Sequence, residues 1–283
     1  MTVYDEIKKK FILPNAFDDW QDYRKSLTDI VLSLGGNNCT KSVLVLGAGR
    51  CNDIDIHRLC ASFKNIILAD CDTAAMNEAL KGLTEHEAGK LHILELSLTG
   101  ISENDLSAFC DRTLFSLRAA GTELNSETFC EVISSGIKTL KDHLIKLKGN
   151  LGLNLPKSDI VICNGVFSQL FSTLSFFVRS CAASLPKDLI PKAVETAFKT
   201  DEELKRIGSE IIPQVVDAIL DSATEYAVFG NEYSETHPIE GALCCIEVLR
   251  KNKRFPKEIK LLWDFNRQEN VKYEMLLQIV QQK

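Results

Sequence analysis

The sequence predicts an α/β fold: a doubly wound, mostly parallel seven-stranded sheet with a C-terminal antiparallel hairpin and helical insertions. The first observation is the segment Ser42–Asp72, where one apolar run ends at Gly47-Ala48-Gly49 and a second ends at Asp70. The second observation is a C-terminal pair of segments whose apolar residues alternate. A strand, a glycine turn, a helix, a strand and an acid form the unit with which a parallel sheet binds a nucleoside.

Composition limits the classes of protein that need to be considered. The chain has 283 residues, of which 45% are apolar, enough to bury both faces of a sheet. The formal net charge of −6 does not support general attraction to nucleic acid. No run of about 18 apolar residues occurs and the N-terminal stretch is charged, so we expect neither a secretion signal nor a membrane span. We therefore expect a cytoplasmic protein.

The ten cysteines include no CxxC pair, and most lie in apolar stretches. This usage favours reduced, buried thiols. Cys51, Cys71 and Cys163 each lie at or just past the end of a predicted strand, which leaves a metal or redox cluster as an alternative. Because no histidine has suitable spacing, we expect no metal.

The chain is predicted to be a single domain, 1–283, that begins with an N-terminal helical segment, 1–36. Within that segment, 15–34 is predicted to be an amphipathic helix, with Asn15 as its cap and Gly35-Gly36 as its end. Its apolar residues recur at helical spacing: Phe17, Trp20, Leu27, Ile30, Val31 and Leu34.

The strands and crossover helices follow in order. Parallel strands are predicted at 42–47, 65–70, 91–96, 159–163 and 225–229, with the last ending at Gly230. Helices are predicted at 53–63, 73–83 and 239–252. The hairpin pairs 259–265 with 271–279 around a turn at 266–270, because apolar residues alternate in both segments.

Two stretches are too long for one crossover helix each. Residues 102–156 and 166–222 carry helical patterning and are predicted to be inserted or capping elements. The second is expected to break at Pro186, Pro191 and Pro213. If these segments form a cap, they would help to select the substrate.

The glycine turn distinguishes between nucleoside ligands. The dinucleotide fingerprint G-x-G-x-x-G/A would need a small third residue where this chain has Asn52. Asp70 is the preferred ribose ligand; Asp72 is its rival and is also a candidate helix cap. Asn52 and Asp53 are candidates for ligand contact or for capping the next helix.

With these residues in place, the chain resembles the class I S-adenosylmethionine-dependent methyltransferases, which have a Rossmann-like fold. Gly47-Ala48-Gly49-Arg50-Cys51 matches their G-x-G-x-G loop except at the third glycine. The resemblance assigns Asp70 to the ribose hydroxyls, Ser97 to the adenine side, and Asn164-Gly165 to the methionine side and reaction face. It also implies that the hairpin forms strand six and a reversed strand seven. About half of the chain is covered.

The resemblance implies S-adenosylmethionine as cofactor and S-adenosylhomocysteine as product. Arg50 could meet the methionine carboxylate or lie in a solvent-facing loop, and His237 could be a base or a surface histidine. The predicted cofactor-binding residues are Gly47, Ala48, Gly49, Arg50, Asn52, Asp70, Cys71, Ser97, Leu98, Asn164, Gly165 and Gln169. The catalytic candidates are Asn164, Tyr233 and His237, and Glu232 is a further pocket candidate.

Methyl transfer to a small-molecule acceptor is the preferred function, with a protein acceptor second. Asn164-Gly165 is not the Asn-Pro-Pro-aromatic tetrad of enzymes that methylate DNA bases or protein glutamine. Neither a nucleic-acid nor a membrane partner is expected, and a homo-oligomer is possible. The alternatives are a non-catalytic adenosylmethionine-binding or scaffold protein, and an oxidoreductase that uses a nicotinamide or flavin cofactor.

Overall fold

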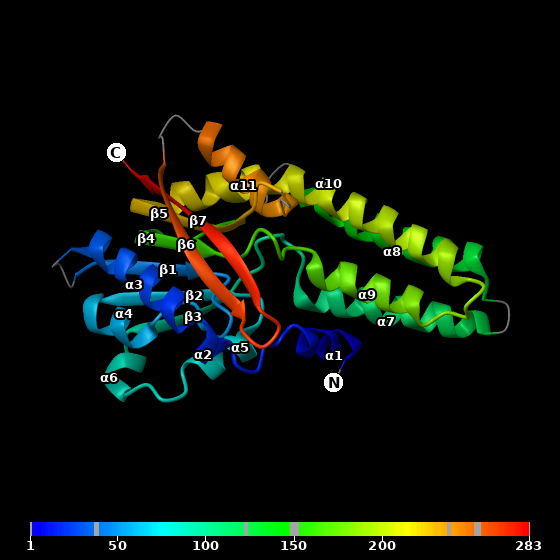
Figure 1. Ribbon diagram of the computed structural model, residues 1–283, viewed down its shortest axis with the longest axis horizontal. Coiled ribbons are helices and arrows are strands. Elements are labelled where there is room, and N and C mark those ends of the chain that lie inside the picture. The colour runs from blue at the N-terminus through cyan, green and yellow to red at the C-terminus, as the bar shows by residue number, and fades with distance from the viewer. Residues whose placement is uncertain are drawn as a thin grey trace. The chain divides into compact units, whose positions relative to one another are not determined.

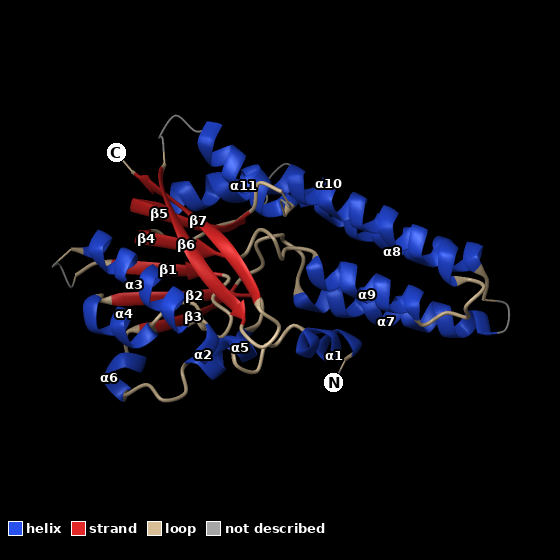
Figure 2. Ribbon diagram, viewed as in Figure 1, coloured by secondary structure: helices blue, strands red, loops and turns tan. Residues whose placement is uncertain are grey.

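A computed structural model describes residues 2–36, 40–121, 124–147, 153–236, 239–251 and 256–282, without the side chains of 143–147. The chain divides into two compact units. The sheet unit contains Leu13–Ser97, Asn154–Ser168 and Ile212–Lys283, and the helical unit contains Met1–Ile12, Leu98–Leu153 and Gln169–Ile211. Every described strand belongs to the sheet unit (Figure 2).

The described strands form one seven-stranded sheet in the order β3-β2-β1-β4-β5-β7-β6 (Figure 1). Strands β1 to β5 pair in parallel, whereas β7 lies between β5 and β6 and is antiparallel to both. This order confirms the predicted doubly wound sheet with its C-terminal hairpin. The strands are β1 (Ser42–Leu46), β2 (Asn65–Asp70), β3 (Leu91–Glu95), β4 (Ser158–Asn164), β5 (Ala223–Tyr233), β6 (Lys257–Asn266) and β7 (Val271–Gln281).

Strand β5 is longer than its apolar run predicts. The expected end at Gly230 is wrong, because the strand continues to Tyr233. Pairing with β7 holds the extra residues, with Glu232 opposite Met275 and Tyr233 opposite Glu274. A neighbouring strand can thus extend a segment whose composition is typical of a loop.

The predicted N-terminal helix is divided in two. Helix α2 (Ala16–Asp19) ends at Trp20, and α3 (Gln21–Gly35) begins after it. The capping role predicted for Asn15 is wrong, since its side chain makes no capping hydrogen bond. The indole Nε1 of Trp20 donates to the carbonyl of Phe265 at 2.8 Å, which ties this junction to β6.

Aspartates cap the two helices of the first crossovers. Helix α4 (Ile56–Ser62) begins later than predicted, and Asp55 caps it by accepting from the Arg58 amide at 3.1 Å. The capping alternative for Asp53 is therefore wrong. Asp72 caps α5 (Thr73–Ala79) through the Ala75 amide, which confirms that alternative. A short helix, α6 (Glu85–Ala88), precedes β3.

Helices cover both faces of the sheet. On one face, α3, α4 and α5 contribute Leu27, Leu59 and Met76 to a common core with the strands. On the other face, α11 (Glu240–Lys251) contacts β5, and Asn231 Nδ2 lies 3.4 Å from Cys245 Sγ. Burial of apolar side chains on both faces stabilises a parallel sheet.

The helical unit is built from α1 (Val3–Lys10), α7 (Glu103–Ala120), α8 (Ser126–Leu147), α9 (Ser172–Ala183) and α10 (Ile190–Ser222) as far as Ile211. Helix α7 contacts both α1 and α8. The break predicted at Pro213 is wrong, because α10 continues through it. Pro191 lies in the first turn of α10, where a missing amide costs little. Pro213 removes only one helical hydrogen bond, and burial of the apolar side chains that follow it stabilises the helix there: Val215, Val216 and Ile219.

Glu203 links two helices of this unit. Its carboxylate accepts from Lys141 Nζ of α8 at 2.8 Å and from Arg206 of α10 at 2.7 Å. Hydrogen bonds from Arg206 and Lys141 lower the pKa of Glu203 to about 2. Because the folded pKa lies below the unfolded value of 4.5, the pair stabilises the fold above that pH. The contribution disappears as the pH falls toward 2.

Glu203→Gln is expected to lower the free energy of unfolding at pH 7 by about 0.5–1 kcal/mol, since the pair is partly exposed. The mutant's deficit should shrink as the pH falls below 4.5. Urea titrations from pH 7 to pH 3 measure both effects. Glu195→Gln removes an exposed pair with Lys199 on the same helix and is the control. An equal loss in that variant would contradict a stabilising link between helices.

Candidate functional site

The glycine loop after β1 has a backbone that side chains rarely adopt. Gly47, Gly49 and Cys51 have φ angles of +66°, +47° and +52°. Cys51 occupies the position where the predicted loop lacks its third glycine, so the left-handed conformation persists without glycine there. That conformation costs an L-residue roughly 1–2 kcal/mol. The left-handed conformation therefore recurs at every second residue of the loop, at both glycines and at the position of the missing third.

Packing within the sheet unit explains why residue 47 is a glycine. Its amide donates to the Ala69 carbonyl at 2.8 Å, which joins the loop to the end of β2. A Cβ atom on Gly47 would overlap with Cγ2 of Val166, in the segment after β4. Gly47 is therefore required by its neighbour in the fold, before any ligand is considered.

Gly49 and Asp70 form the polar centre of the loop. The Gly49 amide donates to Asp70 Oδ2 at 2.9 Å, and the Asp72 amide donates to Oδ1 at 2.8 Å. A Cβ on Gly49 would have its nearest atom, Asp70 Oδ2, at 4.0 Å, so this side of the loop has room. A carboxylate oxygen has more than one lone pair. The Asp70 carboxylate is thus held in place and can still accept hydrogen bonds from hydroxyl groups.

Asn164, at the end of β4, lies at the centre of a second polar cluster. Tyr23 Oη donates to Asn164 Oδ1 at 2.6 Å, and Asn164 Nδ2 donates to Asp53 Oδ2 at 2.6 Å. A Cβ on Gly230 of β5 would overlap with Asn164 Oδ1, so this glycine leaves space for the amide. The three polar side chains come from α3, β4 and the loop before α4.

Burial sets the protonation of this cluster. Tyr23 is 1% exposed and its ring stacks on Trp263 with centroids 5.0 Å apart. Burial, together with the charge of Asp53, holds the pKa of Tyr23 well above its usual value, so the phenol is a donor at neutral pH. Burial also raises the pKa of Asp53, and the hydrogen bond from Asn164 opposes that shift.

Tyr23 was absent from the predicted site residues, and Asp53 was named only as an alternative, for ligand contact or for capping. Tyr23 lies three positions after Trp20 and four before Leu27, so it shares the buried face of α3 with them. That spacing could have placed it against the sheet, but not beside Asn164. Arg24 Nη1 donates to the carbonyl of Asn52 at 2.8 Å, which fastens α3 to the loop.

The structure brings several predicted residues together and separates others. Gly47, Ala48, Gly49 and Asn52 share the loop, and Asp70 at the end of β2 accepts from its Gly49 amide. Gly165 follows Asn164 with a φ of +64°. Arg50 is exposed, Cys71 is half-buried, and Ser97 is the last residue of its segment in the sheet unit. Leu98 and Gln169 belong to the helical unit.

The catalytic candidate Tyr233 does not join the cluster around Asn164. Tyr233 lies near Lys260, whose Nζ is 4.8 Å from the ring centroid, and near Arg250 of α11. As an odd-numbered residue of β5, it faces the side of the sheet opposite to Gly230. His237 lies outside the described residues.

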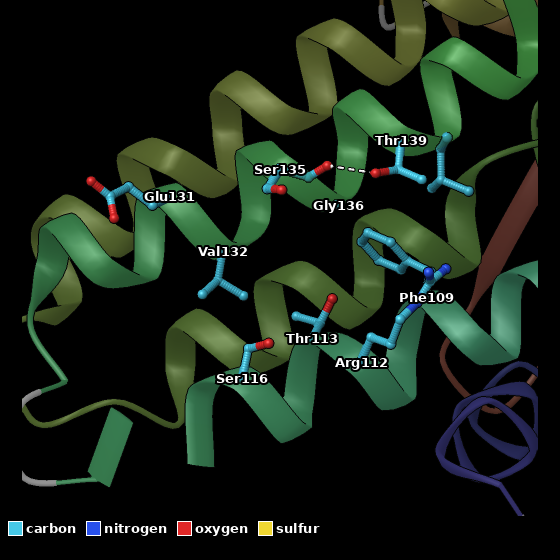
Figure 3. A pocket seen from close by; sticks show the side chains of 10 residues that line it. Phe109, Arg112, Thr113, Ser116, Glu131, Val132, Ser135, Gly136 and Thr139 are labelled. Atoms are coloured by element: carbon cyan, nitrogen blue, oxygen red, sulfur yellow. Dashed lines mark hydrogen bonds between the residues drawn. The ribbon is translucent and has the colours of Figure 1, made fainter. Parts of the chain in front are cut away.

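A separate cavity of about 400 Å³ lies within the helical unit (Figure 3). It is lined by α7 and α8, and Figure 3 shows hydroxyl side chains of both helices facing it. Gly136 of α8 lies against the ring of Phe109, because a Cβ there would come 2.5 Å from Cε2. The residues predicted from the sequence are not among its lining: Phe109, Arg112, Thr113, Ser116, Glu131, Val132, Ser135, Gly136, Thr139 and Leu140.

Two further features concern all the described residues. Their nine cysteines are all free thiols, and no group of three or more histidine, cysteine or acidic side chains among them could hold a metal ion. None of their helices combines the length and apolar character needed to cross a membrane.

Comparisons with known proteins find no matching family model and no matching curated protein. Among solved structures, the chain is similar to the N-methyltransferase NodS from Bradyrhizobium japonicum WM9 in complex with S-adenosyl-L-homocysteine. The two are 11% identical with a TM-score of 0.47, and the match covers 99% of this chain and 98% of that one.

Two other solved structures are similar at the same level. The O-methyltransferase TomG from Streptomyces achromogenes, in complex with SAM, is 10% identical with a TM-score of 0.46, covering 99% and 88% of the two chains. A SAM-dependent methyltransferase from Aquifex aeolicus is 9% identical with a TM-score of 0.43, covering 99% and 100%. Since identity and TM-score are low in each case, the fold is defined by the chain's own strand order.

Proposed function

We propose that this chain is an S-adenosylmethionine-dependent methyltransferase that acts on a small-molecule acceptor. The observation that carries the proposal is the Asp70 carboxylate at the end of β2, held by the Gly49 amide beside the open side of the loop. The left-handed backbone at Gly47, Gly49 and Cys51 and the antiparallel position of β7 support the same assignment.

The start of α4 argues against a dinucleotide. A pyrophosphate needs a helix N-terminus with free amides and close backbone approach. Here the helix begins only at Ile56, and Asp55 already accepts from its Arg58 amide. The carboxylate of Asp53 lies in the same loop, so a diphosphate would meet negative charge. A sulfonium cofactor carries no phosphate and does not face that repulsion.

The residues of the sheet unit suit the parts of this cofactor. Asp70 can accept hydrogen bonds from ribose hydroxyls next to Gly49. Asn164 and Gly165 lie at the end of β4, an edge where ligands bind in open α/β sheets. When bound, S-adenosylmethionine supplies an electrophilic methyl group. The chain's own part is to align the acceptor and exclude water, so positioning can supply much of the acceleration.

Calorimetric titration with S-adenosylmethionine, S-adenosylhomocysteine, NAD and NADP tests the proposal. We expect micromolar binding of the first two, about −8 kcal/mol, and none of the nicotinamides. Binding of a nicotinamide alone would replace methyl transfer with redox chemistry. Binding of none would leave the scaffold alternative. Cofactor binding followed by no turnover in a broad acceptor screen would favour a non-catalytic binding protein.

A further inference from the structure

Glu232 is a buried carboxylate with one oxygen that has no partner. It lies near the end of β5 and is 7% exposed. Ser168 Oγ donates to its Oε1 at 2.8 Å, whereas Oε2 is buried without a hydrogen bond to any described residue. An unpaired buried acceptor costs about 1–3 kcal/mol, and more when it is charged. A group that binds Oε2 would recover this energy.

Glu232 shares its surroundings with the cluster around Asn164. Gly230 and Glu232 are two positions apart on β5, so they face the same side of the sheet, where Gly230 meets the Asn164 amide. The negative charge of Glu232 contributes to the raised pKa values of Tyr23 and Tyr273, which places both phenols within its electrostatic reach. Glu232 therefore belongs to the candidate site, although it does not contact the glycine loop.

Aromatic rings of β6 and β7 lie on the same side of the sheet as Glu232. The ring of Tyr23 stacks on that of Trp263 with centroids 5.0 Å apart. The ring centroids of Trp263 and Tyr273 are 6.4 Å apart. The indole also lies next to Gly165, since a Cβ there would be 3.6 Å from Cη2. Faces of tryptophan and tyrosine attract cations.

The local charge is negative. The carboxylate of Asp53 accepts from Asn164 in the same cluster. The nearby cation, Arg24, donates from Nη1 to the carbonyls of Phe17 and Asn52. Burial raises the pKa of Glu232, as expected for a carboxyl group without a countercharge. The charge of Arg24 acts to lower the pKa of Asp53, whereas the shift of Glu232 has no cation among its causes, so Glu232 is the carboxylate that is short of positive charge.

We propose that Glu232 Oε2 binds the amino group of an amine acceptor, with the rings of Tyr23, Trp263 and Tyr273 around its cation. The inference deepens the proposed function and rests on it. A hydroxyl acceptor would leave the carboxylate charge uncompensated, and a carboxylate acceptor would be repelled. Oε2 can also accept the proton of an ammonium: the N–H bond breaks, the proton moves to Oε2, and nitrogen keeps the electron pair that it needs as a nucleophile.

Binding of matched probes to the full chain, saturated with S-adenosylhomocysteine, tests the inference. The amines are benzylamine, phenethylamine and n-butylamine, each paired with its alcohol: benzyl alcohol, 2-phenylethanol and n-butanol. Calorimetry is the readout, and quenching of tryptophan fluorescence is the second. At least one amine is expected to bind, roughly 10- to 100-fold more tightly than its alcohol, because a hydrogen bond to a charged group is involved.

Glu232→Gln keeps the shape of the side chain and removes its charge. It should abolish the preference for amine over alcohol and leave the affinity for S-adenosylhomocysteine within about twofold. Its urea midpoint should not fall, since it removes an unpaired buried charge. Glu235→Gln makes the same change three residues later at an exposed position and should keep the preference.

The outcomes separate the two proposals. If S-adenosylhomocysteine binds but no amine does, or if Glu232→Gln keeps the amine preference, the amine site is wrong and the proposed function stands. If S-adenosylhomocysteine does not bind but an amine binds through Glu232 in the free protein, the site stands and methyl transfer fails. A preference lost equally in Glu235→Gln would also overturn the inference.

Discussion

Asp70→Ala is expected to weaken binding of S-adenosylmethionine by about 1–3 kcal/mol, or roughly 5- to 150-fold. The substitution removes the charged acceptor proposed for the ribose hydroxyls. It also removes the acceptor of the Gly49 and Asp72 amides, so the glycine loop and the segment after β2 each lose one hydrogen bond. Calorimetric titration of the variant and the wild-type protein measures the change in affinity.

Asp72→Ala is the matched control. It removes a carboxylate two positions away that caps α5 through the Ala75 amide. Loss of such a cap lowers the free energy of unfolding by about 1 kcal/mol and should leave cofactor affinity unchanged. Unchanged affinity in a folded Asp70→Ala variant would remove Asp70 from the site. Loss of affinity in Asp72→Ala alone would mean that Asp72, and not Asp70, binds the ribose hydroxyls.

Gly47→Val is expected to lower the free energy of unfolding by about 2–5 kcal/mol. One part comes from the φ of +66°, which a β-branched residue strongly resists. The other comes from overlap with Val166 Cγ2, which must move before the loop can close. Cofactor binding should be lost as a consequence. Urea denaturation measures the first effect and calorimetry the second.

Two further variants separate packing from ligand approach. Gly47→Ala combined with Val166→Ala relieves the overlap and should recover part of the stability lost in Gly47→Ala alone. Gly49→Ala finds room for its Cβ, so it should cost only about 1–2 kcal/mol of backbone strain. If the cofactor lies beside Gly49, this variant should nevertheless bind it poorly. Full affinity in Gly49→Ala would mean that the ligand lies elsewhere.

Local patterns in the sequence were sufficient to locate the strands of the sheet, although not the end of β5. The apolar run that ends in Asp70 matches β2, Asn65–Asp70, at both ends. Alternation in the hairpin placed Ile259, Leu261 and Trp263 on one face, and they pair with Leu277, Met275 and Tyr273. These features were predictable because a strand's side chains alternate between two faces, one of which is buried.

Contacts between residues far apart in the sequence determine the polar cluster, the end of β5 and the need for glycine at position 47. Tyr23 and Asn164 are 141 positions apart, and Asn164 and Asp53 are 111 apart, so no local pattern joins them. Pairing with β7 keeps Gly230 and Glu232 in β5. Residue 47 must be a glycine because the side chain of Val166, in the segment after β4, occupies the space that a Cβ atom would need. Strands and helices follow from periodic burial along the chain. The polar cluster exists only because parallel strands bring their carboxyl ends to one edge, where hydrogen bonds and excluded volume choose among the residues that meet there.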